Sequence, residues 1–105
     1  HKRDVLRAHC ADVGRDPEAI RMTWSPELCV RTSEAELREV CQRSIWGEQF
    51  DTWRAANLVG TPDEVADKIS QYRALGCRGF IPWCTDYPDT TSIELFATHV
   101  MPEFR

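Results

Sequence analysis

The sequence predicts a small α/β protein built on parallel strands, and three observations lead to this fold class. An amphipathic helix is expected between Thr61 and Gly76. A run of consecutive apolar residues, 80–84, follows it, as expected for a strand that is buried on both faces of a parallel sheet. An earlier segment, 20–24, alternates apolar with polar side chains, which is a strand pattern. Helices that feed strands in this order are the units of parallel α/β proteins.

The predicted central helix carries signals at both of its ends. Thr61 is a good N-cap and Glu64 follows three residues later, so the two form a capping box. Pro62 fits the first helical position, and Gly76 lies just past the end, where a left-handed residue is favoured. The preceding residues, 57–60, are interpreted as a loop. The inner apolar stripe is formed by Val65, Ala66, Ile69 and Tyr72.

The N-terminal part predicts a helix followed by a strand. Residues 2–13 form an amphipathic helix that ends at Gly14. The strand at 20–24 is ended or kinked by Ser25 and Pro26. The apolar residues 28–30 either resume this strand as an edge or belong to a loop. The side of the first helix that we expect to face inward consists of Val5, Leu6, Cys10 and Val13.

The next part of the chain predicts a helix that begins at Ser33 and an aromatic-rich segment after it. Ser33 and Glu36 form a capping box at the start of this helix. Its inner stripe is Leu37, Val40, Cys41 and Ser44. An aromatic-rich stretch then contains Ile45, Trp46, Phe50 and Trp53. Two interpretations stay open: these side chains pack a helix layer onto the strands, or they form a lid or subunit contact, for which Trp and Phe are favoured anchors.

The C-terminal part contains a strand with a proline, a polar turn and a last helix. Pro82 argues against a strand in which every ladder bond is made, so the strand is expected to be short or interrupted. A third capping box is predicted from Thr91 and Glu94. The inward side of the last helix is predicted to be Ile93, Phe96 and Val100, with Leu95 on its flank.

Composition and charge exclude several classes of function. The net charge of −4 argues against a general nucleic-acid binder, which needs a basic surface. No apolar run approaches the roughly 18 residues of a membrane span, and no signal peptide is visible, so a cytoplasmic protein with no membrane partner is expected.

The five cysteines and His9 are the residues considered as metal ligands. Five cysteines without a C-x-x-C pair favour buried free thiols over a disulfide framework or a zinc site. His9 is either a ligand or a partly buried helix-face residue, and no partner at metal spacing supports the first. We therefore predict no metal site.

Four motifs, carried by three stretches of the sequence, together resemble a known family. The stretch VGTPDEVADKISQYRALGCRGFIPW, the later SIELFATHVMPEFR and the early HCADVGRDPEAIRMTWS are similar to the C-terminal end of the luciferase-like monooxygenases. That family typically carries G-T/S-P-x-x-V-A-x-x-(I/L), then A-G-x-x-x-F, then E-x-(F/L)-A-x-x-V-(M/L)-P, after an H-C-x-x-x-G-R-D-P-x-x-I segment. The similarity reaches both ends of the chain and leaves out mainly residues 28–53.

The resemblance implies that residues 1–105 are one segment, the C-terminal portion of a (β/α)8 TIM barrel. It would comprise the end of helix 6, strand 7, helix 7, strand 8 and helix 8, which is about two parallel strands with flanking helices. A complete barrel needs roughly 250 residues, so this barrel is incomplete and has two open sheet edges. We therefore expect the remainder of the barrel, or a second copy of the chain, to cover those edges.

The resemblance also implies an oxidoreductase that moves hydride to or from a flavin-type ring. The implied cofactor is the deazaflavin coenzyme F420, with FMN as the alternative. The family's main cofactor-binding parts lie on earlier strands, and this sequence has no G-x-G-x-x-G or P-loop to replace them. The chain alone is therefore expected to be inactive. Neither the sequence nor the resemblance identifies the substrate.

The residues at the carboxyl ends of the two implied strands are the candidate pocket rim, because barrel active sites are built there. No catalytic proton is assigned to any of them. Asp86 has two interpretations: it holds a substrate hydroxyl or basic group, or it caps the turn. The candidate rim residues are Trp24, Ser25, Trp83, Cys84, Thr85 and Asp86.

A second hypothesis is a non-catalytic α/β module for interaction or dimerisation, with residues 45–53 as its interface. An obligate dimer of this kind would melt at a higher temperature when concentrated, whereas an isolated part of a barrel would be loosely packed or aggregate.

Overall fold

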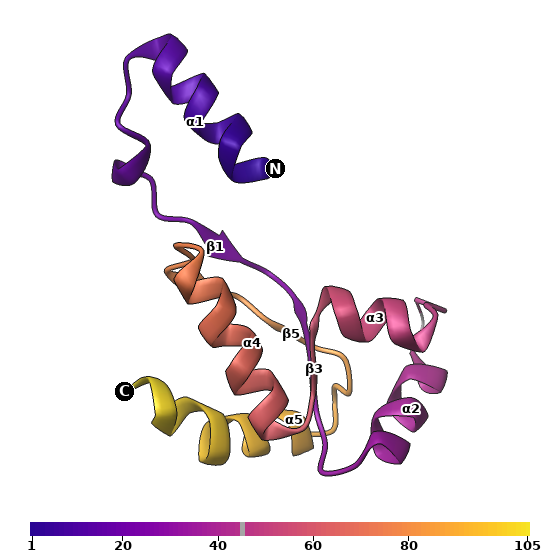
Figure 1. The fold of residues 1–105 in the computed structure, drawn as a ribbon. Coiled ribbons are helices and arrows are strands. Elements are labelled where there is room, and N and C mark those ends of the chain that lie inside the picture. Colours follow the sequence, from indigo (N-terminus) through magenta and orange to yellow (C-terminus); the bar gives the residue numbers. More distant parts are fainter. Residues whose placement is uncertain (45) are drawn as a thin grey trace.

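A computed structural model describes residues 1–44 and 46–105, with short parallel strands at the centre and helices around them (Figure 1). The elements are α1 (Lys2–Val13), a 3₁₀ turn (Pro17–Ala19), β1 (Thr23–Trp24), β2 (Glu27–Val30), α2 (Glu34–Arg43), α3 (Phe50–Ala56), β3 (Leu58–Gly60), α4 (Pro62–Ala74), β4 (Gly79–Phe80), β5 (Trp83–Cys84), α5 (Thr91–Leu95), a π-helical turn (Phe96–Val100) and a 3₁₀ turn (Met101–Phe104).

All strand pairs in the described residues are parallel. β1 pairs with β4, and β2 lies between β3 and β5 in a three-stranded sheet. The expectation of a small α/β protein with parallel strands and flanking helices is therefore confirmed. The described strands form open sheets and do not close into a barrel.

β1 and β2 are two halves of one extended segment, and β4 and β5 are two halves of its neighbour. The backbone N–H groups of Ile81, Trp83 and Thr85 donate across to the first segment at 2.9, 2.9 and 3.1 Å. In a parallel ladder alternate residues point to the same neighbour, so Pro82 loses an N–H only on the outer side, where a proline is tolerated. The predicted interruption is confirmed, and the ladder continues across it.

The first segment differs from its prediction in two ways. Its paired part begins at Thr23, three residues later than expected. Residues 28–30 were expected to form an edge strand or a loop, but β2 is the central strand of the three-stranded sheet. Ser25 and Pro26 separate the halves, as expected.

Strand β3 corrects the interpretation of residues 57–60 as a loop. Leu58, Val59 and Gly60 are all buried and lie opposite Leu28, Cys29 and Val30 of β2. Three residues are too few to show a periodic pattern, so only the pairing with β2 identifies the strand.

The core consists of two clusters on opposite faces of β2. Leu28 and Val30 face α4 and the C-terminal helical segment, whereas Cys29 faces α2 and α3. Figure 1 shows these helices on either side of the β2–β3 pair. The first cluster also contains Leu58, Val65, Ala66, Ile69 and Val100. The second also contains Leu37, Val40, Cys41, Trp53 and Val59.

The second segment is not buried on both faces, which corrects the prediction for residues 80–84. Phe80 and Cys84 pack against the first core cluster. Ile81 and Trp83 point the other way and are 61% and 67% exposed. Apolar residues on consecutive positions therefore mark a strand with one covered face and one open face.

The three predicted capping boxes have different outcomes. The box of α4 is confirmed: the Thr61 N–H donates to Glu64 Oε2 at 2.9 Å, and the Glu64 N–H donates to Thr61 Oγ1 at 3.5 Å. In α2 only half of the box forms, because Glu36 accepts from Thr32 instead of the Ser33 backbone.

The third box is wrong, because α5 begins at Thr91 itself. The N-cap is Thr90, which makes no side-chain capping bond, and Asp89 Oδ1 accepts from the Thr91 backbone N–H at 2.9 Å instead. Ile93 is 49% exposed and does not face inward, whereas Val100 is fully buried.

The helix α1 lies away from the strands and the other helices (Figure 1). Of its predicted inner side only Cys10 is buried, while Val5 is 42% and Val13 77% exposed. A hydrogen bond of 2.6 Å from Arg3 Nη1 to the carbonyl oxygen of Leu75 connects α1 with the end of α4.

All five cysteines are free and four are buried, as predicted. The described residues contain no cluster that could hold a metal ion.

Lys68 of α4 fastens the end of α3. Its ammonium group donates to the carbonyl oxygens of Arg54, Ala55 and Asn57 at 2.9, 2.7 and 2.7 Å. A cation at a helix C-terminus pairs with unsatisfied carbonyls and with the helix dipole. Burial, followed by the nearby Arg54 charge, lowers the pKa of Lys68.

The described part of the chain contains no helix with the length and apolar character of a membrane span.

We expect Gly60→Ala to destabilise the protein by about 1–3 kcal/mol, because the change overpacks the junction of β3 and α4. A Cβ on Gly60 would lie 2.6 Å from Glu64 Oε2 and 2.9 Å from Glu64 Cβ. Urea unfolding followed by circular dichroism measures the change. The control is Ser70→Ala on the exposed side of α4, which should stay within about 0.5 kcal/mol of the parent. An unchanged midpoint for Gly60→Ala would contradict the close contact.

Candidate functional site

An open cavity of about 780 Å³ lies beside the start of β2 and along β5 to the turn that follows it. Its walls come from both strand segments, the end of α2, the residues before α3 and the turn after β5. The lining residues are Ser25, Glu27, Arg43, Ser44, Trp46, Asn57, Trp83, Cys84, Thr85 and Tyr87.

Glu27 is the polar centre of this cavity. Its Oε2 accepts from Trp53 Nε1 at 2.6 Å and from Thr85 Oγ1 at 3.0 Å, so one carboxylate joins β2, α3 and the end of β5. Its backbone N–H donates to Asn57 Oδ1 at 2.9 Å. A carboxylate has about four acceptor sites, so Glu27 keeps capacity for a donor in the cavity.

Exposed aromatic side chains border the cavity. Trp46, Trp83 and Tyr87 are 62%, 67% and 83% exposed. Flat aromatic faces of this kind can stack on a planar ring. Cys84 lies among them, and its burial, followed by the Asp86 charge, raises the pKa of its thiol, so the thiol stays protonated at neutral pH.

A buried ion pair closes the carboxyl ends of β2 and β5. Arg31 follows β2 and Asp86 follows β5, and Arg31 Nη1 lies 2.9 Å from Asp86 Oδ2. Their side chains are only 8% and 3% exposed. Arg31 Nη1 also donates to Ser92 Oγ and to the Val30 carbonyl, at 2.9 and 2.8 Å. The Ser92 N–H donates to Asp86 Oδ2 at 3.1 Å, which places the start of α5 in the same network.

A second cavity of about 340 Å³ adjoins the first and has Asp86 in its wall. Arg43, Thr85 and Tyr87 line both cavities. Asp86 Oδ1 is buried and has no hydrogen-bond partner among the residues that the structure describes. A buried carboxylate oxygen is costly without a partner, so a hydroxyl or cation that reached this atom from the second cavity would be bound favourably.

The structure brings five of the six candidate rim residues to these two cavities. Ser25, Trp83, Cys84 and Thr85 line the larger one, and Thr85 and Asp86 the smaller. Trp24 lies elsewhere. Its ring stacks on Tyr72 of α4, with centroids 3.8 Å apart and planes 6° apart, on the helix-covered face of β1.

Asp86 combines elements of both interpretations given above. It does hold the turn before α5, as the capping interpretation states, through the N–H of Ser92. Its main partner is nevertheless Arg31, 55 residues earlier in the chain. The other carboxylate oxygen, Oδ1, has no partner among the described residues, so it is the atom through which Asp86 could bind a ligand.

Sequence reasoning missed several residues of the site. Glu27 and Arg31 flank the apolar residues 28–30, and charges at both ends of a buried triplet were the available signal for strand ends. Arg43 and Asn57 had no local signal, because they enter the site only through the packing of α2 and α3 beside β2.

The aromatic segment divides between its two interpretations. Trp53 is 1% exposed inside the second core cluster, and Phe50 packs against that cluster. These two residues therefore pack the helix layer. Trp46 is exposed at the cavity, and Ile45 lies outside the described residues.

One curated protein resembles part of the chain. Over 47 residues the chain is 40% identical to the sulfoquinovose monooxygenase of Novosphingobium aromaticivorans, a member of the luciferase-like monooxygenases. The match covers 45% of this chain and 12% of that protein, so the chain spans only a small part of the relative's length. No family model matches the chain. No solved structure matches it either.

The comparison supports a partial similarity to a flavin-dependent family and does not distinguish F420 from FMN. The described residues fit a flavin only as one wall of its site. The aromatic rim suits a planar ring, but Arg43 is the single cation among the residues that line the larger cavity. A phosphate-binding loop is missing from the sequence as well. We therefore derive no reaction step through a cofactor from these residues.

We expect Arg31→Met to destabilise the protein by about 3–5 kcal/mol, because it leaves the Asp86 carboxylate buried without its charge partner. The double variant Arg31→Met/Asp86→Leu should recover much of this loss, since it buries no charge. Urea unfolding measures both.

The control is Arg38→Gln, which removes a surface pair with Glu34 whose side chains are 51% and 56% exposed. Its effect should stay below about 1 kcal/mol. Equal losses of unfolding free energy for Arg31→Met and Arg38→Gln would show that the buried ion pair is no more important for stability than the exposed one.

Proposed function

We propose that this chain is the C-terminal portion of a (β/α)8 barrel of the luciferase-like type. In this proposal the barrel is an oxidoreductase that moves hydride to or from a flavin-type ring, and residues 1–105 supply one wall of its site. The observation that carries the proposal is the 40% identity over 47 residues to a luciferase-like monooxygenase.

The arrangement of the strands is consistent with this proposal. The segments β1–β2 and β4–β5 are parallel neighbours, as strands 7 and 8 of a barrel would be. Even-numbered side chains such as Phe80 and Cys84 pack under the helices. Odd-numbered ones such as Ile81 and Trp83 are exposed and would face the barrel interior. In a barrel each strand has one helix-covered face and one interior face, so the pattern of β4 and β5 matches, whereas β2 has helices on both of its faces and does not match.

The β5 side of the larger cavity is consistent with a site at the carboxyl ends of the strands. Thr85 and Tyr87 follow the carboxyl end of β5, whereas Glu27 is the first residue of β2. Barrel enzymes build their active sites from positions such as Thr85 and Tyr87. In this proposal Glu27 and Asp86 Oδ1 accept hydrogen bonds from the substrate, and the exposed aromatic side chains lie beside the cofactor ring.

The proposed cofactor is coenzyme F420, with FMN as the alternative, and earlier parts of the barrel would hold its phosphate groups. The proposed partner of this segment is the rest of the barrel, which would cover the outer edges of β3 and β5. Uncovered strand edges associate readily, and this is the physical reason for proposing a partner there.

A dimerisation module is the second candidate. The exposed Trp46, Trp83 and Tyr87 favour it, because a second copy could cover them. Burial of Phe50 and Trp53 inside the α2–α3 layer leaves little of the 45–53 segment for an interface. We therefore rank it below the barrel.

The intact mass of this protein in fresh lysate of its source, beside that of the purified sample, separates the two candidates. The barrel proposal expects a parent polypeptide well above the 12.1 kDa of this chain, because a barrel needs roughly 250 residues. The parent should bind F420 or FMN in a fluorescence titration, and the 105-residue chain should not. A 12.1 kDa species alone, in every lysate, would refute the barrel.

We expect Ile81→Asp to destabilise the parent polypeptide by several kcal/mol, because it would place a charge in the packed barrel interior. The matched control is Ile93→Asp, which changes an isoleucine that is 49% exposed on α5. Melting temperature and cofactor titration of both variants are the measurements. A similar small effect of the two substitutions would mean that the Ile81 face is not covered by a barrel.

A further inference from the structure

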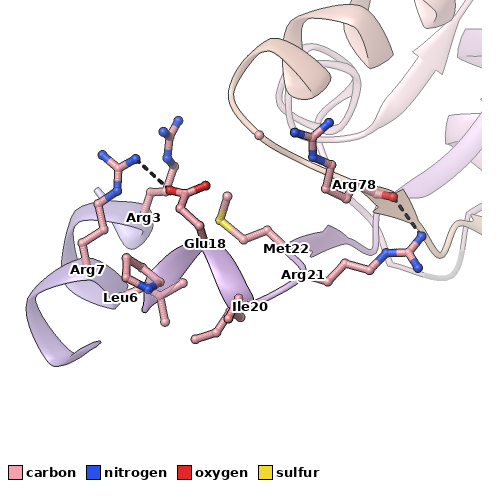
Figure 2. Close-up of a pocket in the computed structure, with 11 residues that line it drawn as sticks. Arg3, Leu6, Arg7, Glu18, Ile20, Arg21, Met22 and Arg78 are labelled. Carbon is pink, nitrogen blue, oxygen red and sulfur yellow. Dashed lines mark hydrogen bonds and ion pairs between the residues drawn. The ribbon is translucent and has the colours of Figure 1, made fainter. Parts of the chain in front are cut away.

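A separate pocket of about 280 Å³ lies between α1 and the main body, at the N-terminal ends of β1 and β4 (Figure 2). None of its lining residues lines the two cavities described above. The pocket is lined by Arg3, Leu6, Arg7, Pro17, Glu18, Ala19, Ile20, Arg21, Met22, Gly76 and Arg78.

Four arginines line this pocket, against a single acidic residue, Glu18. The whole chain has 13 basic and 17 acidic residues and a net charge of −4. Positive charge is therefore concentrated at one place on an otherwise acidic protein. A concave surface of one sign raises the local concentration of ligands of the opposite sign.

The four guanidinium groups keep most of their hydrogen-bond donors free. Arg3 uses one nitrogen for the Leu75 carbonyl at 2.6 Å, and Arg21 uses one for the Arg78 carbonyl at 3.0 Å. Arg78 itself has no side-chain hydrogen bond or ion pair with the residues that the structure describes. Each guanidinium has five N–H donors, so the pocket offers many donors that a ligand could use.

Glu18 forms an ion pair with Arg7 and so offsets part of the positive charge of the pocket. Its Oε1 lies 3.5 Å from Arg7 Nη2, and the two side chains are 79% and 48% exposed. Figure 2 shows this pair at one side of the pocket and Arg21 and Arg78 at the other. An exposed pair at this distance is weak and can be displaced by a better anion.

The remaining lining is apolar. Leu6, Ile20 and Met22 are half-buried, and Figure 2 shows Leu6 beside Arg7 and Met22 between the two groups of arginines. Gly76 keeps the wall open beside them, because a Cβ there would lie 3.1 Å from Met22 Cε. The pocket therefore combines an anion-binding surface with a small apolar floor.

We propose that this pocket binds a tetrahedral oxyanion, a phosphoryl or sulfo group, carried on a small organic body. The oxygens accept from the forked donors of Arg7, Arg21 and Arg78, and the body lies against Leu6 and Met22. Arginine forks match phosphate geometry in this way. Because Arg7 belongs to α1 and Arg78 to the main body, the ligand also holds α1 in place. This proposal does not depend on the oxidoreductase assignment.

The test uses inorganic phosphate and inorganic sulfate as probes, at constant ionic strength maintained with sodium chloride. Isothermal titration and the melting temperature of the intact protein are measured for each probe. We expect saturable binding and a rise in melting temperature with both, and no rise when chloride replaces them. Phosphate gains charge between about pH 6 and 8 whereas sulfate does not, so the affinity for phosphate should rise over this range and the affinity for sulfate should not.

Substitutions of opposite sign make the test specific. Arg78→Gln should weaken phosphate binding about three- to tenfold, because it removes a charged donor pair. Glu18→Gln should strengthen binding about two- to fivefold, because it removes the competing carboxylate. Neither side chain is buried, so both variants should fold.

The matched control is Arg15→Gln, an exposed arginine that is not part of the pocket lining. It makes the same change in net charge as Arg78→Gln, and it should leave the affinity unchanged. The proposal is overturned if phosphate and sulfate act no differently from chloride. It is equally overturned if Arg15→Gln weakens binding as much as Arg78→Gln does, or if Glu18→Gln weakens it.

Discussion

Strand β2 is buried on both of its faces, and this burial determines where the other elements lie. Leu28 and Val30 need an apolar layer on one side and Cys29 needs one on the other. α4 and the C-terminal helical segment supply the first, and α2 with α3 supplies the second. A fully buried strand must also have its backbone groups paired. β3 on one edge and β5 on the other provide that pairing. Six surrounding elements thus follow from the requirements of the four residues of β2.

The charged residues at the two ends of β2 then join this core to the site. Glu27 at its start binds Trp53 and Thr85, and Arg31 after its end binds Asp86 and Ser92. Each charge is held by groups from elements that the core has already placed. An ion pair as buried as Arg31–Asp86 contributes little net stability, and its loss on one side is costly. Its effect is therefore to fix the turn after β5, where the two cavities meet.

Local signals explain what the sequence could predict. The α4 capping box needs only Thr61 and Glu64, three residues apart, and it forms as expected. The stripe of Leu37, Val40 and Cys41 depends on helical spacing alone, and all three side chains are buried. Four rim residues reach the larger cavity because their order along the strands is a local property.

Non-local properties explain the misses. β3 is three residues long and is defined by its partner β2, 30 residues earlier. Apolar residues at 80–84 indicate a strand, but they do not show which face a helix covers, so the exposure of Trp83 could not be read from them. Trp24 was assigned to the rim from its place near a strand end, and its alternation phase instead directs it to Tyr72. The partner of Asp86 lies 55 residues away, beyond any local pattern.

The parallel direction of the strands separates the two candidate binding regions. Because β1 and β4 run the same way, Met22 and Arg78 both precede them at one end, and the arginine pocket forms there. The aromatic cavity forms farther along the same ladder, where Glu27 at the start of β2 lies opposite Trp83 of β5. The first region gathers guanidinium groups, whereas the second gathers aromatic rings with the carboxylates of Glu27 and Asp86. A ligand in one region therefore makes no direct contact with the other. Any coupling between them must pass along the two ladder segments, where Trp24 and Phe80 pack together at the midpoint.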